Sequence, residues 1–146
     1  MNPEIQGRQY PPTAAYLVGS EKVREFARAV QATHPEHHDV DAARAAGHAD
    51  VIAPPTFPIV IQELTLRQLL EDESAGVDFS RVVHGDQRFT ASRPIVAGDE
   101  LTAQLTVTSV KSLGGNDMVT SESVITDVDG KHVVTATSSL VVRAEA

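Results

Sequence analysis

The sequence predicts an α+β domain in which a curved antiparallel β-sheet wraps around one long, buried helix. A segment near the middle of the chain is apolar around most of a helix circumference, and residues 82–142 alternate between apolar and polar side chains. A buried helix needs a large covering surface, which such a sheet can supply. With 146 residues, 41% of them hydrophobic, the chain fits one domain over residues 1–146.

The first predicted element is an amphipathic helix over residues 20–33. Ser20 is a suitable N-cap, and Pro35 disfavours a helical conformation at the residue before it. A short second helix is expected at 42–46, capped by Asp41 and closed by Gly47. The buried face of the first helix is defined by apolar residues at the helical spacing, namely Val23, Phe26, Ala27 and Val30.

The central helix is predicted over residues 58–72. Pro54 and Pro55 fix an extended segment before it, Thr56 is the expected N-cap, and Pro58 is tolerated in a first helical turn. Little of this helix is polar, because apolar residues lie on most sides of it: Ile59, Val60, Ile61, Leu64, Leu66, Leu69 and Leu70.

Four strands are predicted within residues 80–143, and we expect them to form an antiparallel meander. The turn at Asp129-Gly130 is the strongest hairpin signal in the chain. One apolar helix wrapped by such a sheet is the hot-dog arrangement; an α+β roll without wrapping is the alternative. A free sheet edge also suggests a dimer. The expected strands are 82–92, 101–108, 118–126 and 132–142.

Composition excludes several classes of function. Twelve Lys and Arg against twenty Asp and Glu give a net charge of −8, which argues against binding to nucleic acid or to an anionic membrane surface. No apolar run is long enough to span a bilayer, and residues 1–6 do not resemble a secretory leader, so a cytoplasmic location is expected. Without cysteine, disulfides, thiolate nucleophiles and zinc ribbons are excluded.

Two regions resemble a known family. Residues 26–39, followed by 45–47 and 50–54, resemble the hydratase segment of MaoC-like hot-dog proteins, the (R)-specific enoyl-thioester hydratases and dehydratases, whose signature is D-x-N-P-x-H. Residues 84–89 and 93–99 resemble the HadA-type subunits of mycobacterial (3R)-hydroxyacyl-carrier-protein dehydratases. The resemblance extends over residues 10–142, and it implies neither a metal nor a cofactor.

The sequence departs from the active pattern of that family. Matching Pro35 to the family proline places His37 at the catalytic histidine and Ala32 at the catalytic aspartate. Hydration of an enoyl thioester needs an acid–base pair and N–H donors for the developing oxyanion. Alanine cannot transfer a proton, and the prolines before the central helix carry no N–H. The nearby backbone donors that remain are Thr56, Phe57 and Ile59.

Three sources of the missing carboxylate are open. Asp39 or Glu36 could pair with His37, since both are close in sequence. His84 and Asp86 are two residues apart on a predicted strand, which would put them on one face. The third source is a partner subunit that supplies both catalytic side chains, and this hypothesis agrees best with the HadA-type resemblance.

We therefore predict a substrate-holding, non-catalytic subunit of a heteromeric (3R)-hydroxyacyl-thioester dehydratase in fatty-acid-type elongation. The acyl group would be carried by acyl carrier protein or CoA, and the partner would be a catalytic MaoC-like paralogue. The alternatives are a homodimeric hydratase that uses His37 and a non-enzymatic acyl-thioester-binding protein. The residues expected to border the substrate are Ala53, Pro54, Pro55, Thr56, Phe57 and Ile59.

Other chemistry-bearing residues have simpler interpretations. The histidine-rich stretch 34–39 is expected to be a solvated loop, because zinc ligands are usually held at fixed spacings on regular elements. Glu63 lies too far inside the central helix to serve a hot-dog thioesterase. A basic patch for an acidic carrier protein could be formed by Arg88, Arg93 and Lys111.

Overall fold

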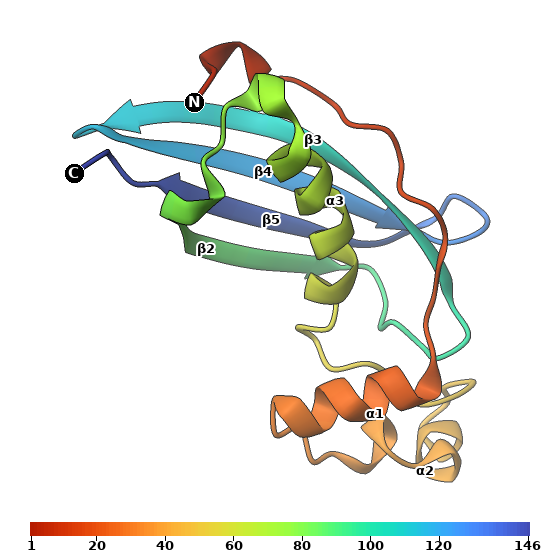
Figure 1. The fold of residues 1–146 in the computed structure, drawn as a ribbon. Helices are drawn as coiled ribbons and strands as arrows, with labels where there is room; N and C mark the ends of the chain where they lie inside the picture. The colour runs from red at the N-terminus through yellow and green to blue at the C-terminus, as the bar shows by residue number, and fades with distance from the viewer.

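In the computed structural model, which describes residues 1–146, helix α3 (Ile59–Glu71) lies across one face of a five-stranded antiparallel sheet (Figure 1). The sheet curls around the helix, which confirms the predicted hot-dog arrangement. The strands are β1 (Tyr16–Leu17), β2 (Val82–Ala91), β3 (Glu100–Leu113), β4 (Asn116–Thr126) and β5 (His132–Val142).

The order of the strands corrects the predicted meander. Strands β3, β4 and β5 are neighbours in chain order, but β2 pairs with β5 at the far edge, and the sheet order is β1-β3-β4-β5-β2. The alternation of apolar residues marks where strands occur, but it does not fix which strand each one pairs with. The two-residue β1 at the other edge was not predicted.

The predicted turn at Asp129-Gly130 is present, and a second glycine turn joins β3 to β4. Leu113 pairs with Asn116 across a two-glycine loop in which Gly114 and Gly115 have φ of 62° and 81°, as a type I′ turn requires. In the next turn Gly130 has a φ of 75°, and an oxygen of the Asp127 carboxylate accepts hydrogen bonds from two backbone N–H groups of the loop.

Helix α3 separates two core clusters that lie at its two ends. Phe57 and Ile61 belong to the cluster at its start, and Leu66 and Leu69 to the cluster near its end. Between the two clusters the buried face of the helix is polar. This differs from the prediction, in which the helix is apolar on most sides. Gln62 and Thr65 are fully buried there, and the sheet beneath them carries small side chains, which let the helix lie close: Ser121, Ser123, Ala136 and Ser138.

The ends of the predicted helices need correction. Helix α1 (Ser20–Ala29) begins after Gly19 and stops four residues before the expected end. Gln31 adopts a left-handed φ of 59°, and the N–H of Ala32 donates to the carbonyl of Ala27 at 2.8 Å, a Schellman closure that ends the helix before Pro35 can act. Helix α2 (Val40–Ala45) is capped by Asp39 rather than Asp41.

Helix α3 begins after Pro58, without a side-chain cap from Thr56. Four short 3₁₀-helices complete the fold, at Pro3–Ile5, Pro35–His37, Glu73–Ala75 and Phe79–Arg81. None of the helices has the length and apolar character needed to cross a bilayer.

Candidate functional site

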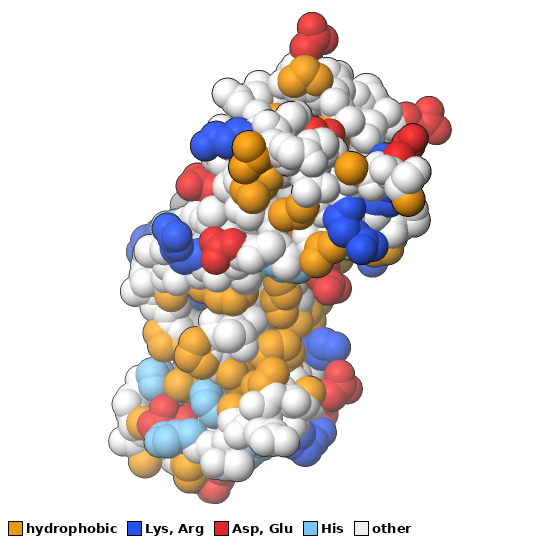
Figure 2. Space-filling model, turned by 90° about the vertical axis from the view of Figure 1, so that its left-hand side faces the viewer, with side chains coloured by type: hydrophobic (Ala, Val, Ile, Leu, Met, Phe, Trp, Pro, Cys, Tyr) orange, Lys and Arg blue, Asp and Glu red, His pale blue; other side chains and the backbone are white.

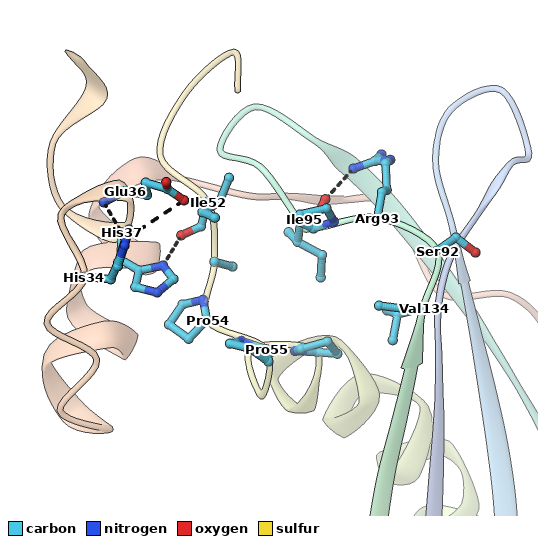
Figure 3. Close-up of a pocket in the computed structure, with 14 residues that line it drawn as sticks. His34, Glu36, His37, Ile52, Pro54, Pro55, Ser92, Arg93, Ile95 and Val134 are labelled. Carbon is cyan, nitrogen blue, oxygen red and sulfur yellow. Dashed lines mark hydrogen bonds and ion pairs between the residues drawn. The ribbon is translucent and has the colours of Figure 1, made fainter. Parts of the chain in front are cut away.

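A cavity of about 610 Å³ lies beside the start of α3, between the histidine-rich loop and the segment that joins β2 to β3 (Figure 3). Figure 2 shows histidine side chains gathered at the end of the molecule that contains α1 and α2, next to a run of hydrophobic side chains. The cavity is lined by His34, Glu36, His37, Ile52, Ala53, Pro54, Pro55, Pro58, Ala91, Ser92, Arg93, Pro94, Ile95 and Val134.

Backbone hydrogen bonds hold the proline-rich wall of this cavity in place. The N–H of Ile52 donates to the carbonyl of Glu36 at 3.0 Å, and the N–H of Ala53 donates to the carbonyl of Ile95 at 2.8 Å. A further bond runs from Ala97 to Val51 at 3.0 Å. Residues 51–53 therefore connect the histidine loop on one side with the β2–β3 connection on the other.

His37 lies on the cavity wall but has no acidic partner. Its Nδ1 is 2.7 Å from the carbonyl oxygen of Ile52, so Nδ1 carries the proton that it donates there (Figure 3). No carboxylate hydrogen-bonds to the ring. In a neutral His37 the bond to Ile52 makes the other ring nitrogen, Nε2, an acceptor and orients the ring, but no carboxylate lies in hydrogen-bond contact to stabilise a protonated ring.

The structure does not bring a replacement carboxylate to His37. Asp39 is engaged in capping α2, where its Oδ1 accepts from the N–H of Asp41 at 2.8 Å. The Glu36 carboxylate instead lies 3.8 Å from His48 and 4.0 Å from His34. At the position that resembles the catalytic aspartate, Ala32 contributes a carbonyl that pairs with Nε2 of His38 at 2.7 Å.

His84 and Asp86 do not form the predicted pair on one strand face. The register of β2 shifts at Gly85, so that His84 opposes Leu140 while Asp86 opposes Ser139. Adjacent residues of β5 point to opposite faces of the sheet, and His84 and Asp86 therefore do so as well. A β-bulge is the physical reason that the period-two argument is wrong here.

The start of α3 offers few N–H donors. Pro54, Pro55 and Pro58, which line the cavity, have none. The N–H of Phe57 donates to the carbonyl of Pro54 at 2.9 Å, and that of Ile59 donates to Thr56 at 3.2 Å. Only the N–H of Thr56 is left without a partner among the three expected donors, and Thr56 is an exposed residue off the cavity wall.

Half of the residues expected to border substrate line this cavity. Ala53, Pro54 and Pro55 do, whereas Thr56, Phe57 and Ile59 do not. Phe57 is fully buried, with its ring edge-on to Phe26 at 5.3 Å between centroids, so its role is in the core. The opposite wall, residues 91–95 with Val134, was not predicted to border substrate, because the β2–β3 connection and β5 are far from residues 53–55 in the sequence.

The predicted basic patch is not formed. Arg93 makes a two-point contact with Asp99, at 2.8 and 3.1 Å, and lies 3.6 Å from Asp127, so its charge is balanced within the chain. The hydrogen bonds to Asp99 raise the pKa of Arg93. Arg88 faces Thr137 on β5, while Lys111 lies in the β3–β4 hairpin, so the three cations do not converge.

Comparison with known proteins defines the class of this fold and site. Residues 4–136 match the family described as "FAS1-like, dehydratase domain region". A solved structure of a MaoC-like dehydratase superposes with a TM-score of 0.87 at 37% identity, covering 95% of this chain and 42% of that one. The chain thus belongs to the hot-dog dehydratase family.

More specific relatives are UPF0336 proteins of full-length similarity. The one from Leifsonia xyli subsp. xyli is 68% identical over 145 residues, which cover 99% of this chain and 97% of the relative. The one from Clavibacter michiganensis subsp. michiganensis is 66% identical with the same coverage. A chain of the truncated HadBC (3R-hydroxyacyl-ACP dehydratase) complex from Mycobacterium tuberculosis is 35% identical, with a TM-score of 0.80 and coverage of 94% and 96%.

Proposed function

We propose that this chain is the substrate-holding subunit of a heteromeric (3R)-hydroxyacyl-thioester dehydratase of the cytoplasm. The complex would remove water reversibly from a 3-hydroxyacyl group carried by acyl carrier protein or CoA. In this proposal the acyl chain enters the cavity beside α3, where Ala53, Pro54 and Pro55 contact it. A related MaoC-like subunit supplies the catalytic aspartate and histidine.

The observation that supports the proposal is a cavity whose set of catalytic groups is incomplete. Of the two histidines that line it, His37 donates through Nδ1 to a backbone carbonyl and has no carboxylate partner, and His34 is an exposed residue 4.0 Å from Glu36. Its helix-side wall is made of prolines, which cannot donate to an oxyanion. Dehydration of a 3-hydroxyacyl thioester requires removal of the α-proton, protonation of the leaving hydroxyl and stabilisation of the enolate oxygen. In this chain no carboxylate pairs with His37 and the proline wall offers no N–H to an oxyanion, while the largely apolar surface of the cavity suits an alkyl chain.

The edge of the sheet gives a partner subunit a place to bind. Strand β2 pairs on one side with β5 and has no strand on its other side, and its outward-facing Val83 is 45% exposed. An unpaired edge strand presents a row of free N–H and C=O groups with which a strand of another chain can pair. The name of the HadBC complex supports a paired arrangement of related subunits. A second copy of the chain would use the same edge in the homodimeric alternative.

The test is hydration of a C4 to C16 series of trans-2-enoyl thioesters, followed spectrophotometrically. The purified chain is measured alone, and then after co-expression with a MaoC-like relative that carries an intact D-x-N-P-x-H segment. We expect turnover only in the co-expressed complex. Turnover by the chain alone, abolished in His37→Ala, would overturn the proposal and establish the homodimeric hydratase. Acyl-thioester binding with no effect on any hydratase would establish a non-enzymatic binding protein.

A further inference from the structure

A second cavity, of about 650 Å³, lies further along the same helix. Its lining combines apolar and charged side chains: Glu63, Leu66, Arg67, Leu70 and Glu71 of α3, Phe79 just before β2, Val82 and His84 of β2, and Leu140 of β5. The first cavity is bordered by Pro58 at the start of α3 and by Ala91 at the end of β2. Both cavities therefore border the space between α3 and the edge strand β2, one at each end of it.

A pair of hydrogen-bonded glutamine side chains lies between the two cavities. Nε2 of Gln62 donates to Oε1 of Gln87 at 3.0 Å, and Nε2 of Gln87 donates back to Oε1 of Gln62 at 2.6 Å. Gln62 is one helical turn after Pro58 and on the same face. Gln87 lies on β2 between Ala91 and His84, on the face that α3 covers, because it opposes the buried Ser138.

This pair is unlike its surroundings. Gln62 has no exposed surface, and the two amides satisfy each other in a reciprocal contact that joins α3 to the edge strand. The next covered residue on β2 toward the first cavity is Phe89, which packs against the apolar core cluster at the start of α3. An aromatic side chain can change rotamer without losing a hydrogen bond, whereas the two amides cannot separate without losing both.

We propose that the Gln62–Gln87 pair is the stop that limits how long an acyl chain this protein holds; this inference rests on the proposed function. A chain that enters past Pro58 and Ala91 reaches the pair after one turn of α3. Because an alkyl chain offers no hydrogen bond, passing the pair would leave a buried amide unsatisfied, which is costly. With the pair replaced by apolar side chains, which lose no hydrogen bond when they move aside, a longer chain would pass from the first cavity toward the second.

Thr65 and Ser123 provide a matched control. They form the other buried side-chain hydrogen bond of α3, with 2.7 Å between their oxygens. Ser123 is on β4, so this contact lies toward the middle of the sheet and away from β2. Replacing both members of a buried polar pair by apolar groups of similar shape is nearly neutral for stability. Thr65→Val with Ser123→Ala therefore removes a buried polar contact, together with the 2.6 Å hydrogen bond from Thr65 Oγ1 to the backbone carbonyl of Gln62, and leaves the two glutamine amides and their reciprocal hydrogen bonds in place.

The experiment measures binding of saturated acyl-CoA from C4 to C16 to the purified chain by titration calorimetry. We expect the wild type and the Thr65→Val/Ser123→Ala control to share one length above which affinity falls. Gln62→Leu/Gln87→Leu should bind the chains beyond that length about tenfold more tightly. The double variant Gln62→Met/Gln87→Met, which also leaves no buried amide unpaired, should shift the limit in the same direction if the leucine variant does not fold.

Two results would overturn this inference, and they differ. If the wild type binds short chains and the glutamine variants have the same length limit, the Gln62–Gln87 pair does not set that limit, while the proposed function stands. If neither the wild type nor any variant binds acyl-CoA or the matching acyl groups on acyl carrier protein at any length, the proposed function fails and the stop fails with it.

Discussion

The two ends of helix α3 are built differently. At its C-terminal end, Asp72 accepts hydrogen bonds from the hydroxyl of Tyr10 at 2.6 Å, from Arg8 at 2.7 Å and from Ser74 at 2.7 Å. At its N-terminal end the helix begins after Pro58 without a side-chain cap and borders a cavity. The C-terminal end is hydrogen-bonded to the N-terminal segment of the chain, whereas the N-terminal end forms part of the wall of a largely apolar cavity. We therefore expect substitutions at the first end to change stability and those at the second to change ligand binding.

Asp72→Asn should have the largest effect on stability. Asparagine keeps the shape but loses the charge that strengthens the hydrogen bonds from Tyr10 and Arg8. We expect the free energy of unfolding to fall by about 1–3 kcal/mol, measured by urea denaturation. The control is Asp39→Asn at the cap of α2, where asparagine is an equally good N-cap and little change is expected. Equal losses of unfolding free energy in both variants would show that the hydrogen bonds of Asp72 do not give this end of α3 a special role in stability.

The same end should make stability depend on pH in a defined direction. Hydrogen bonds from Tyr10 and Ser74 hold the pKa of Asp72 below its ordinary value. A carboxyl group with a lowered folded-state pKa stabilises the fold above its unfolded value of about 3.9, and this contribution is lost as the pH falls. The difference in unfolding free energy between wild type and Asp72→Asn should therefore shrink below about pH 4. A constant difference down to pH 2 would contradict this assignment.

At high pH, ionisation of Tyr10 should lower the stability of the fold at this end of the helix. Burial, together with the hydrogen bond to Asp72, raises the pKa of Tyr10 to about 12. The neutral phenol stabilises the fold below the unfolded value of about 10, and this contribution is lost as the pH rises toward the folded value. In Tyr10→Phe the stability should fall less steeply above about pH 10 than in the wild type. Parallel profiles of the two proteins would contradict this.

At the cavity end, His37→Ala should have a smaller effect on folding. It removes one hydrogen bond, to the carbonyl of Ile52, and we expect a loss of about 0.5–1.5 kcal/mol in the free energy of unfolding. His34→Ala, at an exposed ring in the same loop, is the control and should change stability by less than about 0.5 kcal/mol. If His37→Ala lowers the free energy of unfolding as much as Asp72→Asn does, the cavity end also stabilises the fold.

Features with a local cause could be predicted from the sequence. The central helix was expected at 58–72 and spans Ile59–Glu71, because its apolar pattern and the prolines before it act within a few residues. The strands and the turn at Asp129-Gly130 were predicted for the same reason. Of the site, the proline wall and the position of His37 could be predicted from the family resemblance, since they form one continuous stretch of chain.

Features that depend on distant residues were missed. The pairing of β2 with β5, the bulge at Gly85 and the Gln62–Gln87 contact each join segments that are far apart or shift a register by one residue. An apolar pattern carries no information about such partners. Helix α1 ends early for a different reason: a closing left-handed residue, Gln31, is not glycine and gives no sequence signal.

The central claim is that this chain holds the substrate while a partner performs the chemistry. It is tested most directly in the co-expressed complex, by replacing one histidine at a time and measuring hydration of enoyl thioesters. We predict that His37→Ala changes kcat by less than about threefold, while alanine at the partner's signature histidine lowers kcat by about 10²-fold or more. A loss of that size from His37→Ala, with the partner variant still active, would contradict the account.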